Sequence, residues 1–180
     1  MKKLAYIIIF TFVLVGCNAP SVQTVEEKEM NYFLTNYEVT EYHPFTQIDV
    51  YKTIELLEKG TGIIVFGFPE CPWCQVVLPV LEEAAILTET KNIYYFNPRD
   101  IRDQNTTEYK LLIALLEDYL ETDDNGDLRL FVPDVYVISE GAVLYHHLGS
   151  IENQDDPNIP LTADQIDELR NIYIRMLRLI

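Results

Sequence analysis

An apolar segment that runs directly into a pair of cysteines constrains the fold of this chain more than any other feature. Residues 62–68 read GIIVFGF, a continuous apolar run that is typical of strands covered by helices on both faces. Cys71 and Cys74 follow at once, and the pattern after them predicts a helix over residues 73–88. A doubly covered strand that leads into a helix favours the α/β class, in which helices flank a central sheet.

The other elements continue this alternation. The last helix is predicted to begin at Thr162, which can form a capping box with Gln165. The predicted order is β-α-β-α-β-α-β-β-α, with an acidic turn at residues 121–129. Strands are predicted at residues 37–42, 62–68, 92–97, 130–138 and 142–149, and the earlier helices at residues 46–59, 73–88 and 106–120.

The N-terminus has the layout of a secretory signal. Two lysines precede an apolar run from Leu4 to Val15, which at about 12 residues is shorter than the roughly 20 needed to span a membrane. The residues Leu-Val-Gly-Cys that end at Cys17 resemble the bacterial lipobox, which implies cleavage before Cys17 and attachment of lipid to it. We therefore expect residues 1–16 to be a lipoprotein signal peptide; the alternative is an ordinary signal peptide with an unrelated cysteine.

The segment that follows is mostly polar and shows no sustained periodicity. We expect residues 17–36 to be a lipidated, flexible tether that gives the domain reach. The alternative is an extra N-terminal helix packed on the domain. Residues 37–180 are long enough for one domain with its own core and too short for two.

The charge of the chain restricts its partners. Acidic residues outnumber basic ones by 29 to 13, and the formal net charge is −16. Nucleic acid is excluded as a partner, because its phosphates require cationic side chains. The same charge repels anionic lipid headgroups, so we expect lipid to hold the chain at a membrane. A basic client is mildly favoured, although an acidic surface that only maintains solubility explains the composition as well.

The two cysteines have the spacing of neighbours on one helical turn. Cys71 is expected at the N-cap and Pro72 at the first helical position, where its missing N–H costs nothing. Free N–H groups and the helix dipole stabilise a thiolate at that end. We therefore expect Cys71 to be the exposed attacking thiol and Cys74, one turn deeper, to be the resolving thiol.

The element order and several residues at fixed offsets together resemble the thioredoxin superfamily over residues 37–180. Pro79 lies five residues after the second cysteine, where that family kinks its active-site helix. The stretch VPDVYVISEGAVL is similar to the family's cis-proline strand and hairpin, with Gly141 and Gly149 in register. The resemblance implies a thioredoxin-like fold with a central mixed sheet flanked by helices.

The resemblance also implies which residues act. Cys71 and Cys74 form the redox-active pair, and no other cofactor is expected. Pro133 takes the cis-proline role facing the disulfide, and the backbone of Val132 pairs with an extended segment of a client protein. Asp134 either places negative charge near this client groove or faces water.

The chain departs from the family pattern at several positions. Val65 stands where thioredoxin proper has a buried acid, so proton transfer at Cys74 must use water or another group. Glu70 could serve, or could only aid solubility. Trp73 forms either an apolar rim for clients or packing over the active-site helix. The pair Pro72-Trp73 is similar to that of glutaredoxins and lacks the histidine of strongly oxidising disulfide formers.

Other functions compete with redox chemistry. A zinc site needs four ligands, and beyond the two cysteines only His43, His146 and His147 are candidates. His146 and His147 are adjacent in a predicted strand, so they point to opposite faces, and we expect no metal site. A non-catalytic binding or holdase protein that uses the cis-proline groove remains the main alternative.

The sequence thus predicts a thiol–disulfide oxidoreductase, lipid-anchored at the outer face of a bacterial cytoplasmic membrane. Its expected partners are protein or peptide clients, among which the acidic charge mildly favours basic ones, and an upstream redox partner. It resembles two groups in Gram-positive bacteria: thioredoxin-like accessories of bacteriocin production, which form disulfides, and reductases that keep thiols available. The direction of electron flow stays open.

Overall fold

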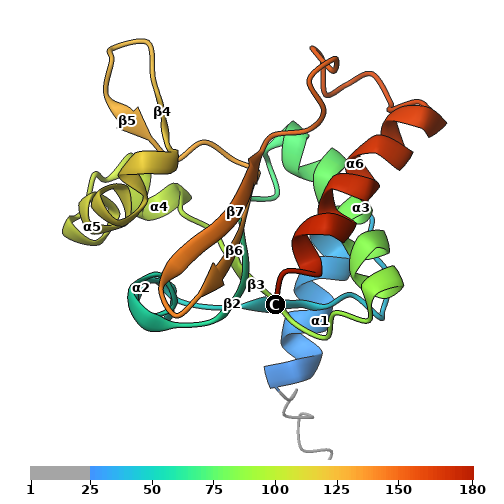
Figure 1. Ribbon diagram of the computed structural model, residues 1–180, viewed down its shortest axis with the longest axis horizontal. Coiled ribbons are helices and arrows are strands. Elements are labelled where there is room, and N and C mark those ends of the chain that lie inside the picture. Colours follow the sequence, from blue (N-terminus) through green and yellow to red (C-terminus); the bar gives the residue numbers. More distant parts are fainter. Residues whose placement is uncertain (1–24) are drawn as a thin grey trace, which may run out of the picture.

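The computed structural model describes residues 25–180, which form a mixed five-stranded sheet flanked by helices (Figure 1). Strands β1, β3 and β2 run parallel to one another, and β6 and β7 continue the sheet antiparallel in the order β1-β3-β2-β6-β7. This is a thioredoxin-like topology, as predicted. The strands are β1 (Phe45–Gln47), β2 (Gly62–Phe66), β3 (Ile93–Phe96), β6 (Asp134–Ser139) and β7 (Ala142–Leu148).

Helices cover both faces of this sheet (Figure 1). On one face α1 (Val25–Asn36), α3 (Pro72–Thr88) and α6 (Ala163–Leu177) lie over the strands, and α3 packs against α6. On the other face lie α2 (Val50–Lys59) and α5 (Thr107–Leu116), which ends in a 3₁₀ turn at Glu117–Tyr119. The short α4 (Arg99–Asp103) follows β3. No helix within residues 25–180 is both long and apolar enough to cross a membrane.

The central strand β2 shows why the apolar run was diagnostic. Val65 belongs to the buried cluster on the α3 face, and Ile64 and Phe66 belong to the cluster on the α2 face. All three side chains are fully buried. Since alternate residues of a strand point to opposite faces, a strand between two helical layers must be apolar at every position. The prediction of a doubly covered strand is confirmed.

The N-terminal segment differs from the predicted tether. Residues 25–36 form helix α1, and Phe33 on this helix is fully buried against Phe45 and Tyr95. Tyr37 follows Phe33 by four residues, just beyond the end of the helix, so the two side chains lie on the same side. The packed helix that was the alternative is therefore observed from Val25 onward. Residues 1–24, with the predicted signal peptide and Cys17, lie outside the described residues.

The strand predicted at residues 37–42 is also wrong, since the first strand is β1 at Phe45–Gln47. The backbone N–H of Thr40 donates to the buried carboxylate of Glu82 at 2.9 Å instead of to a neighbouring strand. The acidic turn is confirmed and carries two short strands, β4 (Glu121–Thr122) and β5 (Leu128–Arg129). The carboxylate of Asp123 closes the turn by accepting N–H groups within it.

Candidate active site

The cysteine pair lies where the loop after β2 enters α3. Cys71 is the N-cap of this helix, in an extended backbone conformation, and its sulfur accepts the backbone N–H of Cys74 at 3.3 Å. The N–H of Cys71 donates to the carbonyl of Phe68 at 3.1 Å, which fixes the loop before the helix. Pro72 occupies the first helical position. The predicted N-cap arrangement is confirmed.

The burial of the two sulfurs differs in part from the prediction. Cys71 is only 6% exposed and Cys74 is fully buried, so neither side chain stands free in solvent. The Cys71 thiol donates to the carbonyl oxygen of Val132 at 3.5 Å, because the loop before β6 lies against it. The expected exposure of Cys71 is therefore wrong, whereas the expected order, with Cys74 the deeper thiol, holds.

The pKa values of the two cysteines are shifted in opposite directions. The hydrogen bond between the two side chains, with the backbone N–H groups of Cys74 and Trp73, lowers the pKa of Cys71 to about 7. Burial, and then the neighbouring Cys71 sulfur, raises the pKa of Cys74. Above about pH 7 the pair therefore keeps its remaining proton on Cys74, which stabilises the thiolate of Cys71.

Two arginines of α4 contribute positive charge beside Cys71. The guanidinium groups of Arg99 and Arg102 lie 5.2 and 5.3 Å from the ring centre of Phe68, and Arg102 also lowers the pKa of Cys71. Arg99 pairs with Glu70 at 2.9 Å, so the negative charge expected from Glu70 has a cation beside it. This cation–π cluster was missed, because α4 follows the next strand and carries no motif.

The loop opposite the cysteines contains the predicted cis peptide bond. The bond between Val132 and Pro133 is cis, and Pro133 is buried. Its carbonyl accepts the N–H of Gly149 at 2.8 Å, and Gly149 has a positive φ of 74° that favours glycine. Val132, Pro133 and Cys71 thus come together in one place, as the resemblance implied.

Asp134 is placed differently from either expectation. It begins β6, is 1% exposed and lies 3.4 Å from Nδ1 of His146 through its carboxylate. Burial raises the pKa of Asp134, and the hydrogen bond with His146 opposes the shift. The same hydrogen bond raises the pKa of His146. Asp134 therefore neither faces water nor adds charge to a surface groove; it lies on an interior strand of the sheet, opposite Phe66 of β2 and Leu148 of β7.

The remaining predicted residues lie on or beside α3. Trp73 is half-buried and packs against the core on the α3 face, and Pro79 lies inside the helix. His146 stacks on Tyr136 and His147 contacts Tyr173, which lie on opposite faces of the sheet, as predicted. Within residues 25–180, no three His, Cys, Asp or Glu side chains gather in a way that could hold a metal ion.

A cluster of tyrosines behind the cysteines was not anticipated. The hydroxyl groups of Tyr37 and Tyr95 lie 2.7 Å apart, and Tyr32 adds a third hydroxyl 3.4 Å from that of Tyr95. Gly67 lies between the buried thiol and this cluster. A Cβ atom placed on Gly67 would be 3.3 Å from the sulfur of Cys74 and 3.6 Å from the Tyr95 ring. Burial raises the pKa of Tyr37 and Tyr95, so both hydroxyl groups keep their protons.

The position of the tyrosine cluster explains why sequence analysis missed it. Tyr32 belongs to α1 and Tyr37 directly follows it, in or beside the stretch interpreted as a tether. The side chain of Gln75 fastens this helix to α3 by donating to the carbonyl oxygens of Asn36 and Pro69. The aromatic spacing of Tyr32, Phe33 and Tyr37 was the available signal.

The sequence matches no protein-family model and no curated protein. The fold and the cysteine pair carry the likeness to thioredoxins. A low-pKa thiol at a helix N-terminus, a buried second thiol and a carbonyl from a cis-proline loop form an arrangement capable of thiol–disulfide chemistry.

Proposed function

We propose that the protein is an extracytoplasmic thiol–disulfide oxidoreductase that exchanges disulfides with secreted proteins or peptides. One observation carries this proposal: Cys71 and Cys74 share a helical turn and have pKa values shifted in opposite directions. Such a pair supplies an attacking thiolate, Cys71, and a protonated resolving thiol, Cys74. The nearby Val132 carbonyl belongs to a loop that could pair with an extended client.

The proposed cycle moves two electrons between the pair and a client. The thiolate of Cys71 attacks one sulfur of a client disulfide; that S–S bond breaks, and the other client sulfur leaves and takes a proton. Cys74 then loses its proton and attacks Cys71, which releases the second client thiol and leaves a Cys71–Cys74 disulfide. Run in reverse, the same steps oxidise a client dithiol. An upstream dithiol or disulfide partner restores the starting state.

Insulin turnover tests this proposal directly. The wild-type chain should catalyse reduction of insulin disulfides by dithiothreitol, and the double variant Cys71→Ser/Cys74→Ser should lose all catalysis. Exchange no faster than in the double variant would favour a non-catalytic protein that only binds clients. The reduction potential of the pair, compared with that of the compartment, then assigns the direction of electron flow.

The proposed location rests on the N-terminal sequence. We expect the chain to be cut before Cys17 and held by lipid at the outer face of the membrane, with two acyl chains giving stable anchoring. Cys17→Ser should release the protein into the medium or leave it unprocessed. Full processing with unchanged membrane retention of this variant, measured by fractionation and mass spectrometry, would refute the lipid anchor.

A further inference from the structure

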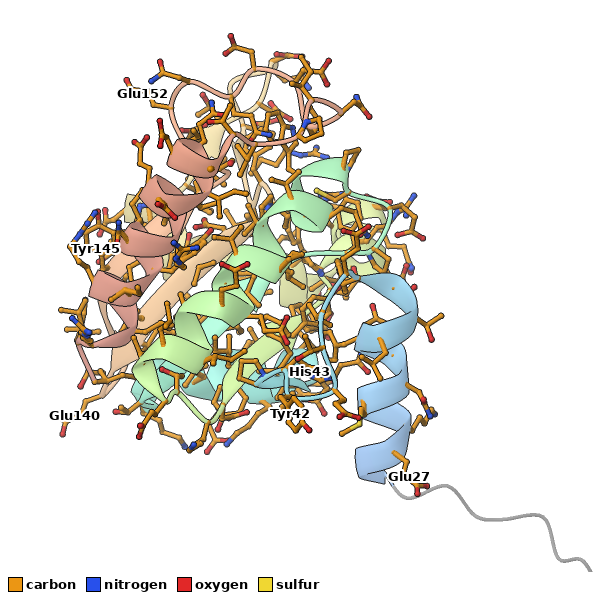
Figure 2. The ribbon with its side chains drawn as sticks, turned by 90° about the vertical axis from the view of Figure 1, so that its right-hand side faces the viewer. Glu27, Tyr42, His43, Glu140, Tyr145 and Glu152 are labelled. Atoms are coloured by element: carbon orange, nitrogen blue, oxygen red, sulfur yellow. The ribbon has the colours of Figure 1, made fainter. Side chains whose placement is uncertain are left out.

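A groove runs along α3 beside the attacking cysteine. It encloses about 590 Å³ and begins at Glu70 and Pro72, the residues that flank Cys71. It continues past Gln75 and Pro79 to the loop between β7 and α6. Figure 1 and Figure 2 show this loop at the same end of the molecule as the first turn of α3. Val132 and Pro133 do not line it, so it is separate from the cis-proline side.

The walls of the groove are unsuited to backbone pairing. Five of the residues that line it are prolines, and they come from the loop before α3, from α3 itself and from the loop before α6. Proline has no N–H to donate, so an extended occupant gains few backbone hydrogen bonds there. The apolar surface of Val76, Leu161 and Ile166 instead favours contact with apolar side chains.

The charged side chains that line the groove are all acidic. Glu38, Glu70 and Glu83 line it, and its lining contains no lysine or arginine. Glu70 and Glu83 pair with Arg99 and Arg170, whereas exposed Glu38 forms no ion pair within the described residues.

The loop before α6 adds to this negative charge. Glu152, Asp155 and Asp156 precede its groove-lining prolines and are exposed; Figure 2 labels Glu152 on the loop. A cationic occupant therefore matches both the groove and its rim, whereas an acidic one is repelled by both.

We propose that this groove binds a cationic, apolar segment that flanks the reactive cysteine of a client. The inference rests on the proposed function and deepens it, because the groove begins beside Cys71 and extends to one side only. A segment on one side of the client cysteine then occupies the groove while the cysteine reaches Cys71. Client selection thereby depends on charge next to the disulfide, in addition to pairing at Val132.

Matched peptides test the groove. Each peptide carries one cysteine as a mixed disulfide with a chromogenic aromatic thiol, and the same apolar residues flanked by either lysines or glutamates. The charged flank is placed N-terminal to the cysteine in one pair of peptides and C-terminal in the other. Release of the aromatic thiol by the reduced protein gives a rate constant for each peptide. A small uncharged disulfide reports the intrinsic reactivity of Cys71, without contacts in the groove.

The wild-type protein should prefer the lysine peptide over the glutamate peptide by roughly tenfold at low salt, in one flank position only. Glu38→Lys should reduce this preference by about fivefold. Glu58→Lys is the matched control: it changes the net charge equally on exposed α2, on the other face of the sheet, and should alter the preference by less than about twofold. Glu58→Lys should leave the reaction with the uncharged disulfide unchanged, and the preference of each variant is a ratio of two peptide rates measured on that same variant.

Three results would contradict the proposed role of the groove without affecting the proposed function. They are no charge preference, an equal preference in both flank positions, or an equal loss of the preference in Glu38→Lys and Glu58→Lys. Failure of both peptides to react, with the uncharged disulfide still consumed, would overturn it too. By contrast, loss of reaction with every disulfide would contradict the oxidoreductase proposal itself.

Discussion

At the scale of single residues, the site depends on the two sulfurs being unlike. Cys71 lies at the N-terminal end of α3, where backbone N–H groups and the Cys74 thiol stabilise its thiolate. Cys74 lies one turn inside the helix against the sheet, where burial keeps its proton bound. The cysteine spacing allowed this division to be predicted. The Val132 carbonyl that covers Cys71 could be placed only through the family resemblance, since 61 residues separate the two.

The first prediction concerns the pH dependence of alkylation. The lowered pKa means that Cys71 loses its thiolate as pH falls through about 7, whereas an ordinary thiol loses it near 8.5. Iodoacetamide labelling of the reduced protein should therefore proceed first at Cys71 with a midpoint near 7, followed by mass spectrometry. Faster labelling of Cys74 would show that the two roles are reversed.

The second prediction concerns Arg102. Removing its charge with Arg102→Gln should move the alkylation midpoint of Cys71 upward, because a nearby cation favours the thiolate. Arg175→Gln, an exposed change in the last turn of α6, should leave the midpoint in place. The Arg102 effect should also shrink at high salt. An unchanged midpoint would show that Arg102 does not stabilise the thiolate of Cys71.

At the scale of elements, sequence patterns were reliable where burial was complete. β2 could be predicted because its apolar run is short and rich in β-branched residues, and α3 because the residues at its start mark a helix N-terminus. β1 could not, because it has only three residues and its pairing with β3 depends on distant contacts. α1 was only the alternative to a tether, because its buried side is narrow: Phe33 is fully buried, whereas neighbouring Leu34 is 40% exposed.

The third prediction tests whether α1 is part of the domain. Phe33→Ala should destabilise the protein by about 3–5 kcal/mol, since it leaves a cavity among packed aromatic rings. Leu34→Ala on the same helix should cost less than about 1 kcal/mol, because that side chain is already partly in water. Urea unfolding measures both changes. Equal, small losses would show that residues 25–36 are only a tether.

At the scale of the whole molecule, the two helical faces support different parts of the site. The α3 face holds both cysteines and the tyrosine cluster, and the α2 face holds Asp134 with His146. The cis-proline loop crosses between them, and Val132 packs against both clusters. The acidic groove lies on the outer side of α3. The cis-proline loop and the groove thus lie on different sides of the cysteine pair, and both proposals assign client contacts to them.

Trapping of mixed disulfides tests the central claim most directly. Cys74→Ser and Cys71→Ser are each incubated with the same disulfide peptide, and covalent adducts are counted by intact-mass spectrometry. The account predicts that Cys74→Ser accumulates an adduct through Cys71, because no resolving thiol remains, whereas Cys71→Ser forms almost none. Equal adducts in both variants, or an adduct in Cys71→Ser alone, would contradict the assignment of Cys71 as the attacking thiol.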